Sequence, residues 1–133
     1  MSANYAIYPQ HRLIVLTFTG VFAPETAEKT TKAYLADPLF ENGYEQIIDL
    51  SGVTEVDAKF KEMSGFVDNT ANRVKTIKRS RCVLVATSEV VYGMARMYQQ
   101  LGADKFPYDV LVVRSEKDAL KTFGIAATHL SDL

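Results

Sequence analysis

The sequence predicts a single α/β domain with a mixed, mainly parallel five-stranded sheet and about four helices. Short apolar runs of strand character alternate with longer segments whose apolar residues recur at helical spacing, in the order β-β-α-β-α-β-α-β-α. No internal repeat or Pro/Gly-rich linker divides the 133 residues, and this length suits one domain. Such alternation implies parallel strands joined by right-handed crossovers, with helices packed on the sheet faces.

The first half of the chain predicts three strands and one helix. The strands are expected over residues 4–8, 12–19 and 46–50, with a turn at residues 9–11 that makes the first two antiparallel. Pro24 is predicted to begin the helix, since proline is favoured in a first helical turn. The helix should end near Asp37, because the residue before Pro38 is forced out of helical geometry. A turn through Ser51 and Gly52 is expected after the third strand.

The second half repeats the alternation. The expected elements are helices over about residues 58–77, 90–101 and 115–124, and strands over residues 81–87 and 109–114. The long helix carries one apolar stripe of Phe60, Met63, Val67, Ala71, Val74 and Ile77. The strand from residue 81 is apolar almost throughout, as in a strand covered on both faces. Gly102 is a plausible terminator for the next helix.

Composition excludes several classes of protein. An apolar content of 47% and a net charge of −1 are typical of a globular domain and argue against nucleic-acid binding. No signal peptide or membrane span is recognised, so we expect a cytoplasmic protein. The single cysteine, Cys82, excludes an internal disulfide and is expected to be a buried, inert thiol. The basic residues between Arg73 and Arg81 are interpreted as complementing a helix C-terminus.

The candidate binding residues lie where the third strand leads into the long helix. Asp49, Ser51 and Asp57, followed by Ala58 and Lys59, occupy the carboxyl end of a strand, where α/β folds usually keep their sites. One interpretation is a polar site for a nucleotide or a metal. The other, which we favour, is that Asp and Ser cap turns and the helix end.

Motifs for catalysis, metal binding or cofactor binding are not recognised. The seven glycines have neither phosphate-loop nor dinucleotide-binding spacing. His11 and His129 have no partner at metal-ligand spacing, and no nucleophile-elbow sequence occurs. We therefore expect no enzyme activity, no metal and no cofactor.

The helix over residues 90–101 has an unusually wide apolar surface. Its residues Tyr92, Arg96 and Met97 are candidates for a homodimer contact or for the wall of an apolar ligand site, and burial against the sheet is the equally weighted alternative. Gly93 costs about 1 kcal/mol relative to alanine inside a helix. Its presence predicts close approach by the backbone of another element.

Two segments resemble a known family. Residues 47–53, Ile-Ile-Asp-Leu-Ser-Gly-Val, followed by Val56-Asp57, resemble the STAS domain of bacterial anti-sigma-factor antagonists. Residues 91–98, Val-Tyr-Gly-Met-Ala-Arg-Met-Tyr, resemble the small bacterial proteins grouped as STAS/Sec14-like. The resemblance implies a binding or switching module. In the family's switch proteins a phosphorylatable serine follows the aspartate that matches Asp57. Here Ala58 stands in its place, so no phosphate ester can form there.

Two functions remain open from the sequence. The first is a non-enzymatic regulatory or interaction module that binds a protein partner through the loop and helix start over residues 51–59. The alternative is a carrier or sensor for a small, lipid-like or otherwise apolar ligand, as the Sec14 resemblance implies. Composition does not separate them, because aromatic and methionine side chains serve cores and ligand pockets equally well.

Overall fold

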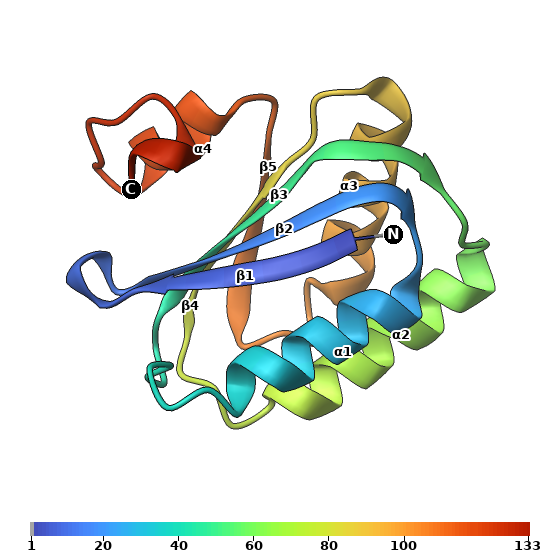
Figure 1. Ribbon diagram of the computed structural model, residues 1–133. Coiled ribbons are helices and arrows are strands. Elements are labelled where there is room, and N and C mark those ends of the chain that lie inside the picture. The colour runs from blue at the N-terminus through green and yellow to red at the C-terminus, as the bar shows by residue number, and fades with distance from the viewer. Residues whose placement is uncertain (1) are drawn as a thin grey trace.

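The computed structural model describes residues 2–133 and confirms the α/β class, with a five-stranded sheet and four helices (Figure 1). The strands are β1 (Ser2–Tyr8), β2 (Leu13–Phe22), β3 (Glu45–Val56), β4 (Ser80–Val85) and β5 (Tyr108–Val113). The helices are α1 (Pro24–Leu35), α2 (Phe60–Val74), α3 (Glu89–Gly102) and α4 (Glu116–Thr122). Short 3-10 turns occupy Pro9–His11 and Leu130–Asp132.

The strands lie in the sheet in the order in which they occur in the chain. β1 pairs antiparallel with β2, and β2 to β5 are parallel. Each crossover moves one strand further in the same direction, so right-handed connections place α1, α2 and α3 on one face. The strand order never reverses, and the fold therefore lacks the crevice that forms at a switch point in doubly wound sheets.

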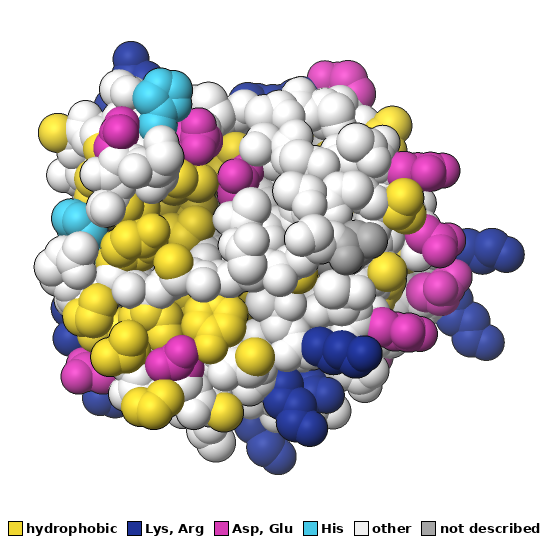
Figure 2. Space-filling view, in the orientation of Figure 1, with side chains coloured by type: hydrophobic (Ala, Val, Ile, Leu, Met, Phe, Trp, Pro, Cys, Tyr) yellow, Lys and Arg dark blue, Asp and Glu magenta, His cyan; other side chains and the backbone are white. Residues whose placement is uncertain are grey.

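Alternate residues of the strands enter two hydrophobic cores. The larger core lies between the sheet and α1 to α3, and it contains Cys82, which is 0% exposed as predicted. The smaller core lies on the other face, where Ala119 and Leu120 of α4 cover Val15, Ile47 and Val83. In Figure 2, hydrophobic side chains gather beside α4 and the C-terminal segment. The helices therefore cover one face of the sheet fully and the other in part.

The turn predicted at Ser51 and Gly52 is wrong. β3 continues to Val56 because β2 also runs on, to Phe22, and the two strands stay paired with two register irregularities. Gly52 permits this pairing: a Cβ atom on it would lie 2.8 Å from Thr19 Cγ2. The helix predicted over residues 58–77 is shorter than expected at both ends, since α2 spans Phe60–Val74.

Candidate functional site

The last part of β3 extends beyond the end of β4, which is its neighbour on one side. β4 pairs with β3 only as far as Asp49, so among residues 2–133 the segment 50–56 has a strand partner only in β2. The N–H of Asp57 donates to the carbonyl of Phe22 over 3.0 Å. Because successive residues of a strand direct their backbone groups to opposite sides, those of Thr54 and Val56 point to the open side. The exposed Glu55 lies between them.

Asp49 and Ser51 are joined by two local hydrogen bonds within β3. Asp49 Oδ1 accepts the backbone N–H of Ser51 over 3.0 Å and its hydroxyl over 2.6 Å. This pair lies at the first register irregularity between β2 and β3. The aspartate thus satisfies a backbone N–H within a strand, at an irregular position, and not in a turn or at the start of a helix as favoured from the sequence.

The predicted site residues fall in two places. Asp57, Ala58 and Lys59 follow the end of β3, eight residues beyond Asp49. An extended strand rises about 3.3 Å per residue, which separates the two groups by roughly 25 Å. Asp57, Ala58 and Lys59 therefore lie together between β3 and α2, whereas Asp49 and Ser51 lie within β3 and do not share their surface.

The start of α2 is built around Lys59. Its backbone N–H donates to Glu62 Oε1 over 3.2 Å, which is one half of a capping box. Ala58 is half-buried against the larger core, whereas Asp57 and Lys59 are exposed.

Phe60 differs from its predicted position on the buried stripe of the long helix. Its side chain is 65% exposed, whereas Met63, one turn later, is 0% exposed. Phe60 is the first residue of α2, and helical side chains lean toward the N-terminus, so this ring projects beyond the core. Helical periodicity gave no signal of this exposure, because periodicity does not show where the sheet under a helix ends.

An acidic groove of about 420 Å³ runs between the start of α1 and α2. Carboxylates from both helices and from the end of β3 line it: Glu25, Glu28, Asp57 and Glu62. Figure 2 shows acidic side chains along the side of the molecule where β3 ends and α1 and α2 begin. Asn69 donates to Glu28 over 3.1 Å. A cleft lined by one sign of charge attracts the opposite charge, so this groove favours a cationic group.

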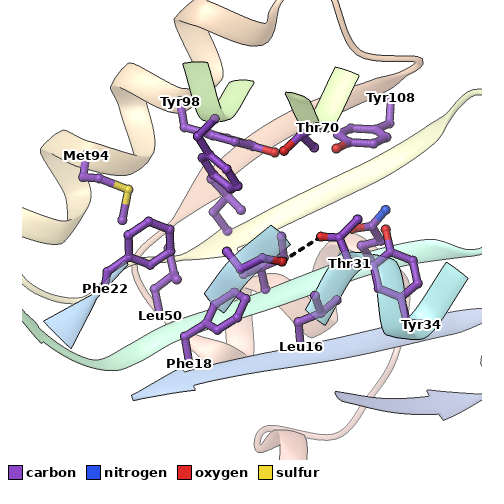
Figure 3. A pocket seen from close by; sticks show the side chains of 15 residues that line it. Leu16, Phe18, Phe22, Thr31, Tyr34, Leu50, Thr70, Met94, Tyr98 and Tyr108 are labelled. Carbon is purple, nitrogen blue, oxygen red and sulfur yellow. Dashed lines mark hydrogen bonds between the residues drawn. The ribbon is translucent and has the colours of Figure 1, made fainter. Parts of the chain in front are cut away.

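A second hollow lies inside the larger core, between the sheet and helices α1 to α3 (Figure 3). It has a volume of about 40 Å³, which is room for about three water molecules. The lining residues are Leu16, Phe18, Phe22, Ala27, Thr31, Tyr34, Gln46, Ile48, Leu50, Phe66, Thr70, Leu84, Met94, Tyr98 and Tyr108. In Figure 3 the oxygen atoms of Thr70, Tyr98 and Tyr108 lie at one end, while Phe22 and Met94 lie at another.

The ionisable groups in and beside this cavity are held neutral. Burial raises the pKa of Tyr34, Tyr98 and Tyr108 above the usual tyrosine value. Burial also raises the pKa of the Cys82 thiol to about 12. Such a thiol stays protonated at neutral pH, and the structure gives it no feature of a nucleophile.

The candidate dimer residues on α3 differ in their surroundings. The guanidinium of Arg114 lies 3.7 Å from the centroid of the half-buried Tyr92 ring. Met97 is half-buried against the larger core. Arg96 is exposed and donates to Gln99 over 2.8 Å. The backbone approach predicted at Gly93 is wrong within this chain, since nothing lies within 4 Å of the position of its Cβ.

Dimerisation through α3 remains a prediction that Arg96→Glu tests. If Arg96 lies in a homodimer contact, the reversed charge is expected to convert dimers to monomers, because a like-charged or unpaired group at an interface is costly. Light scattering during size-exclusion chromatography measures the mass, with Arg73→Glu on α2 as the control. A wild-type protein that is already monomeric, or a variant of unchanged mass, contradicts the contact.

The basic residues that follow α2 have structural partners. Arg81 forms an ion pair with Glu45 over 2.5 Å and donates to the carbonyl of Thr122 over 3.0 Å. Arg79 pairs with Asp109 on the neighbouring strand. These two arginines therefore tie β4 to β3, β5 and the end of α4. Since α2 ends at Val74, only Arg73 lies in its last turn, where the sequence predicted that the basic residues complement the helix C-terminus.

Within residues 2–133, no cluster of three or more His, Cys, Asp or Glu side chains is arranged to hold a metal ion. The helices in this described range are too short or too polar to span a membrane. Comparison with known proteins finds no matching family model and no matching curated protein.

Proposed function

We propose that this chain is a non-enzymatic regulatory or interaction module of STAS type, which binds a protein partner through the end of β3 and the start of α2. The observation that supports this most is Phe60, a 65% exposed aromatic ring at the start of α2. It is flanked in the chain by Asp57 and Glu62, which line the acidic groove. Phenylalanine is one of the aromatic residues that are enriched in protein–protein interfaces relative to the rest of the surface.

The surroundings of Phe60 define the partner's chemistry. The open backbone groups at Thr54 and Val56 suit an extended segment that adds to the edge of β3. Basic side chains of that segment fit the carboxylates of Asp57 and Glu62 in the groove. The ring of Phe60 then supplies the apolar contact. Since Ala58 has no hydroxyl group, control by phosphorylation at that residue is not part of the proposal.

Photo-crosslinking tests the surface directly. A photoreactive phenylalanine analogue placed at residue 60 is expected to crosslink one discrete partner in extracts of the native host. The same analogue at Leu39, which is 59% exposed, is the matched control and should give no such product. The proposal is contradicted if both positions give equal crosslinked products. It is also contradicted if an excess of unlabelled protein competes away none of the products.

Charge reversal then tests the role of the groove. Asp57→Arg is expected to weaken binding of the crosslinked partner at least tenfold, because it replaces attraction of a basic segment by repulsion. Asp104→Arg, at an exposed aspartate outside the groove, is the control. Unchanged affinity in Asp57→Arg, measured by isothermal titration with the purified partner, refutes this surface.

The cavity favours a second candidate function, a carrier or sensor for a small apolar ligand. It is lined by residues of both the sheet and α1 to α3. Its 40 Å³ is far below the roughly 300–1,000 Å³ of sites for drug-sized ligands. A lipid chain therefore does not fit this conformation, and the candidate cargo is a much smaller molecule.

A further inference from the structure

We infer that the cavity between the sheet and α1 to α3 is a binding site for a small, neutral aromatic molecule that carries one hydroxyl group, that is, a phenol. This inference rests on the second candidate function and is independent of the partner surface around Phe60. Three features of the lining define the ligand: its lack of charge, its polar end and its aromatic walls.

The ligand must be neutral. None of the 15 residues that line the cavity is Asp, Glu, Lys, Arg or His. An ion placed there would lose its hydration and find no opposite charge, which is costly in a low-dielectric interior. The tyrosines do not supply a charge either, since burial keeps them protonated. Carboxylates, amines and phosphates are therefore excluded.

The polar end can both donate and accept hydrogen bonds. The side chains of Thr70, Tyr98 and Tyr108 bring hydroxyl groups to this end (Figure 3). Gln46 also lines the cavity, where its side chain is hydrogen-bonded to Tyr34. A hydroxyl group on the ligand both donates and accepts, and it matches such a set better than a purely apolar atom does.

The remaining walls suit an aromatic ring. Phe18 and Phe22 meet edge to face at 6.0 Å and 87°, and Phe22 and Phe66 do so at 6.1 Å and 67°. A ring inserted among them can continue this edge-to-face arrangement, which is worth about 0.5–1.5 kcal/mol per pair. Met94 also lines the cavity, and its side chain is flexible. Binding of a ring requires the displacement of this side chain, because the present volume of about 40 Å³ has room for only about three water molecules.

The polar end is held by a rigid aromatic stack. Phe106 lies between Tyr98 and Tyr108, with ring centroids 5.1 Å and 5.0 Å apart. The ring of Phe106 fits there because Gly102 has no side chain: a Cβ atom would lie 2.0 Å from Phe106 Cε2. The hydroxyl-bearing end is thus preorganised, and adjustment to the ligand falls to Met94.

Backbone amide chemical shifts, recorded during titration with phenol, toluene and benzoate, test the inference on the whole protein. Phenol is expected to bind saturably and to shift the amides of lining residues. Toluene should bind about 3- to 10-fold more weakly, which corresponds to one net hydrogen bond. Benzoate should not bind.

Two variants assign the effect to the cavity. Thr70→Val keeps the shape but removes a hydroxyl, and it is expected to reduce the preference for phenol over toluene. Ala27→Leu places a larger side chain in the lining and should abolish binding of both, with the exposed Ala33→Leu on the same helix as the control. If Ala27→Leu does not fold, a crystal of the wild-type protein soaked with 4-bromophenol locates the ligand by the anomalous signal of bromine.

The outcomes separate the inference from the function on which it rests. If neither phenol nor toluene binds, both the carrier function and the inference fail. Toluene that binds as tightly as phenol leaves the carrier function standing and overturns the phenol class. Binding of benzoate overturns the requirement for a neutral ligand. Binding that survives in folded Ala27→Leu, or a bromine site outside the cavity, overturns the location.

Discussion

Raising the pH from 8 to 11 is expected to unfold the protein cooperatively. Burial raises the pKa of Tyr34, Tyr98, Tyr108 and Cys82 in the folded state. In the unfolded chain the thiol loses its proton near its ordinary pKa of 9.0 and the tyrosines near 10.0. Above these values the unfolded state binds fewer protons than the folded state, so the free energy of unfolding falls as pH rises.

The expected loss is large. Each buried group removes up to about 1.4 kcal/mol of stability per pH unit once its unfolded form is ionised. With four such groups the slope above pH 10 approaches about 5 kcal/mol per unit, against a total stability of about 5–15 kcal/mol for an ordinary domain. Below pH 9 these groups contribute their full stabilisation, because they are protonated in both states.

Urea denaturation at intervals from pH 8 to pH 11 measures this dependence. Tyr108→Phe should make the decline above pH 10 less steep, since it removes one of the four groups. Tyr8→Phe changes a tyrosine at the end of β1, outside this cluster, and serves as the control. If the free energy of unfolding stays constant to pH 11, these tyrosines do not have raised pKa values in the folded state. If Tyr108→Phe and Tyr8→Phe change the slope equally, the decline does not come from the buried cluster.

Gly102→Ala is expected to destabilise the protein by about 1–3 kcal/mol. Alanine is the better helix former, but its Cβ would overlap the ring of Phe106 at 2.0 Å. That ring cannot move freely, because it is buried between Tyr98 and Tyr108. The same variant should disturb the polar end of the cavity and weaken phenol binding.

Gly93→Ala on the same helix provides the matched comparison. Nothing lies within 4 Å of its Cβ position, so only the helix propensity changes and stability should rise by about 0.5–1 kcal/mol. Thermal and urea unfolding of the two variants measure opposite signs. A Gly102→Ala protein as stable as Gly93→Ala contradicts the close contact with Phe106, whereas loss of stability in Gly93→Ala points to an approach from a second copy.

The fold could be predicted because local patterns and topology agree. The helical spacing of Val91, Met94, Ala95 and Tyr98 matches a helix whose residues are buried at these positions. The apolar run from Cys82 to Val85 corresponds to a strand covered on both faces. Ser88 and Ser115 accept hydrogen bonds from Val91 and Asp118, as expected of residues that begin helices.

At the end of β3, long-range pairing overrides the local sequence pattern. Ser51 and Gly52 have the local character of a turn, yet pairing with β2 holds them in a strand. Strand pairing joins residues distant in sequence, so local propensity does not reveal it. The same holds for the acidic groove, whose carboxylates come from three separate elements.

Periodicity and composition within short segments were enough to predict the class of fold, the order of its elements and the burial of the single cysteine. Contacts between distant residues were needed to show that Asp49 and Asp57 lie in different places and that Phe60 faces outward. The same contacts place three tyrosines along a neutral cavity. The physical reason is that such features depend on where strands end and how helices cross them, and these are contacts between distant residues.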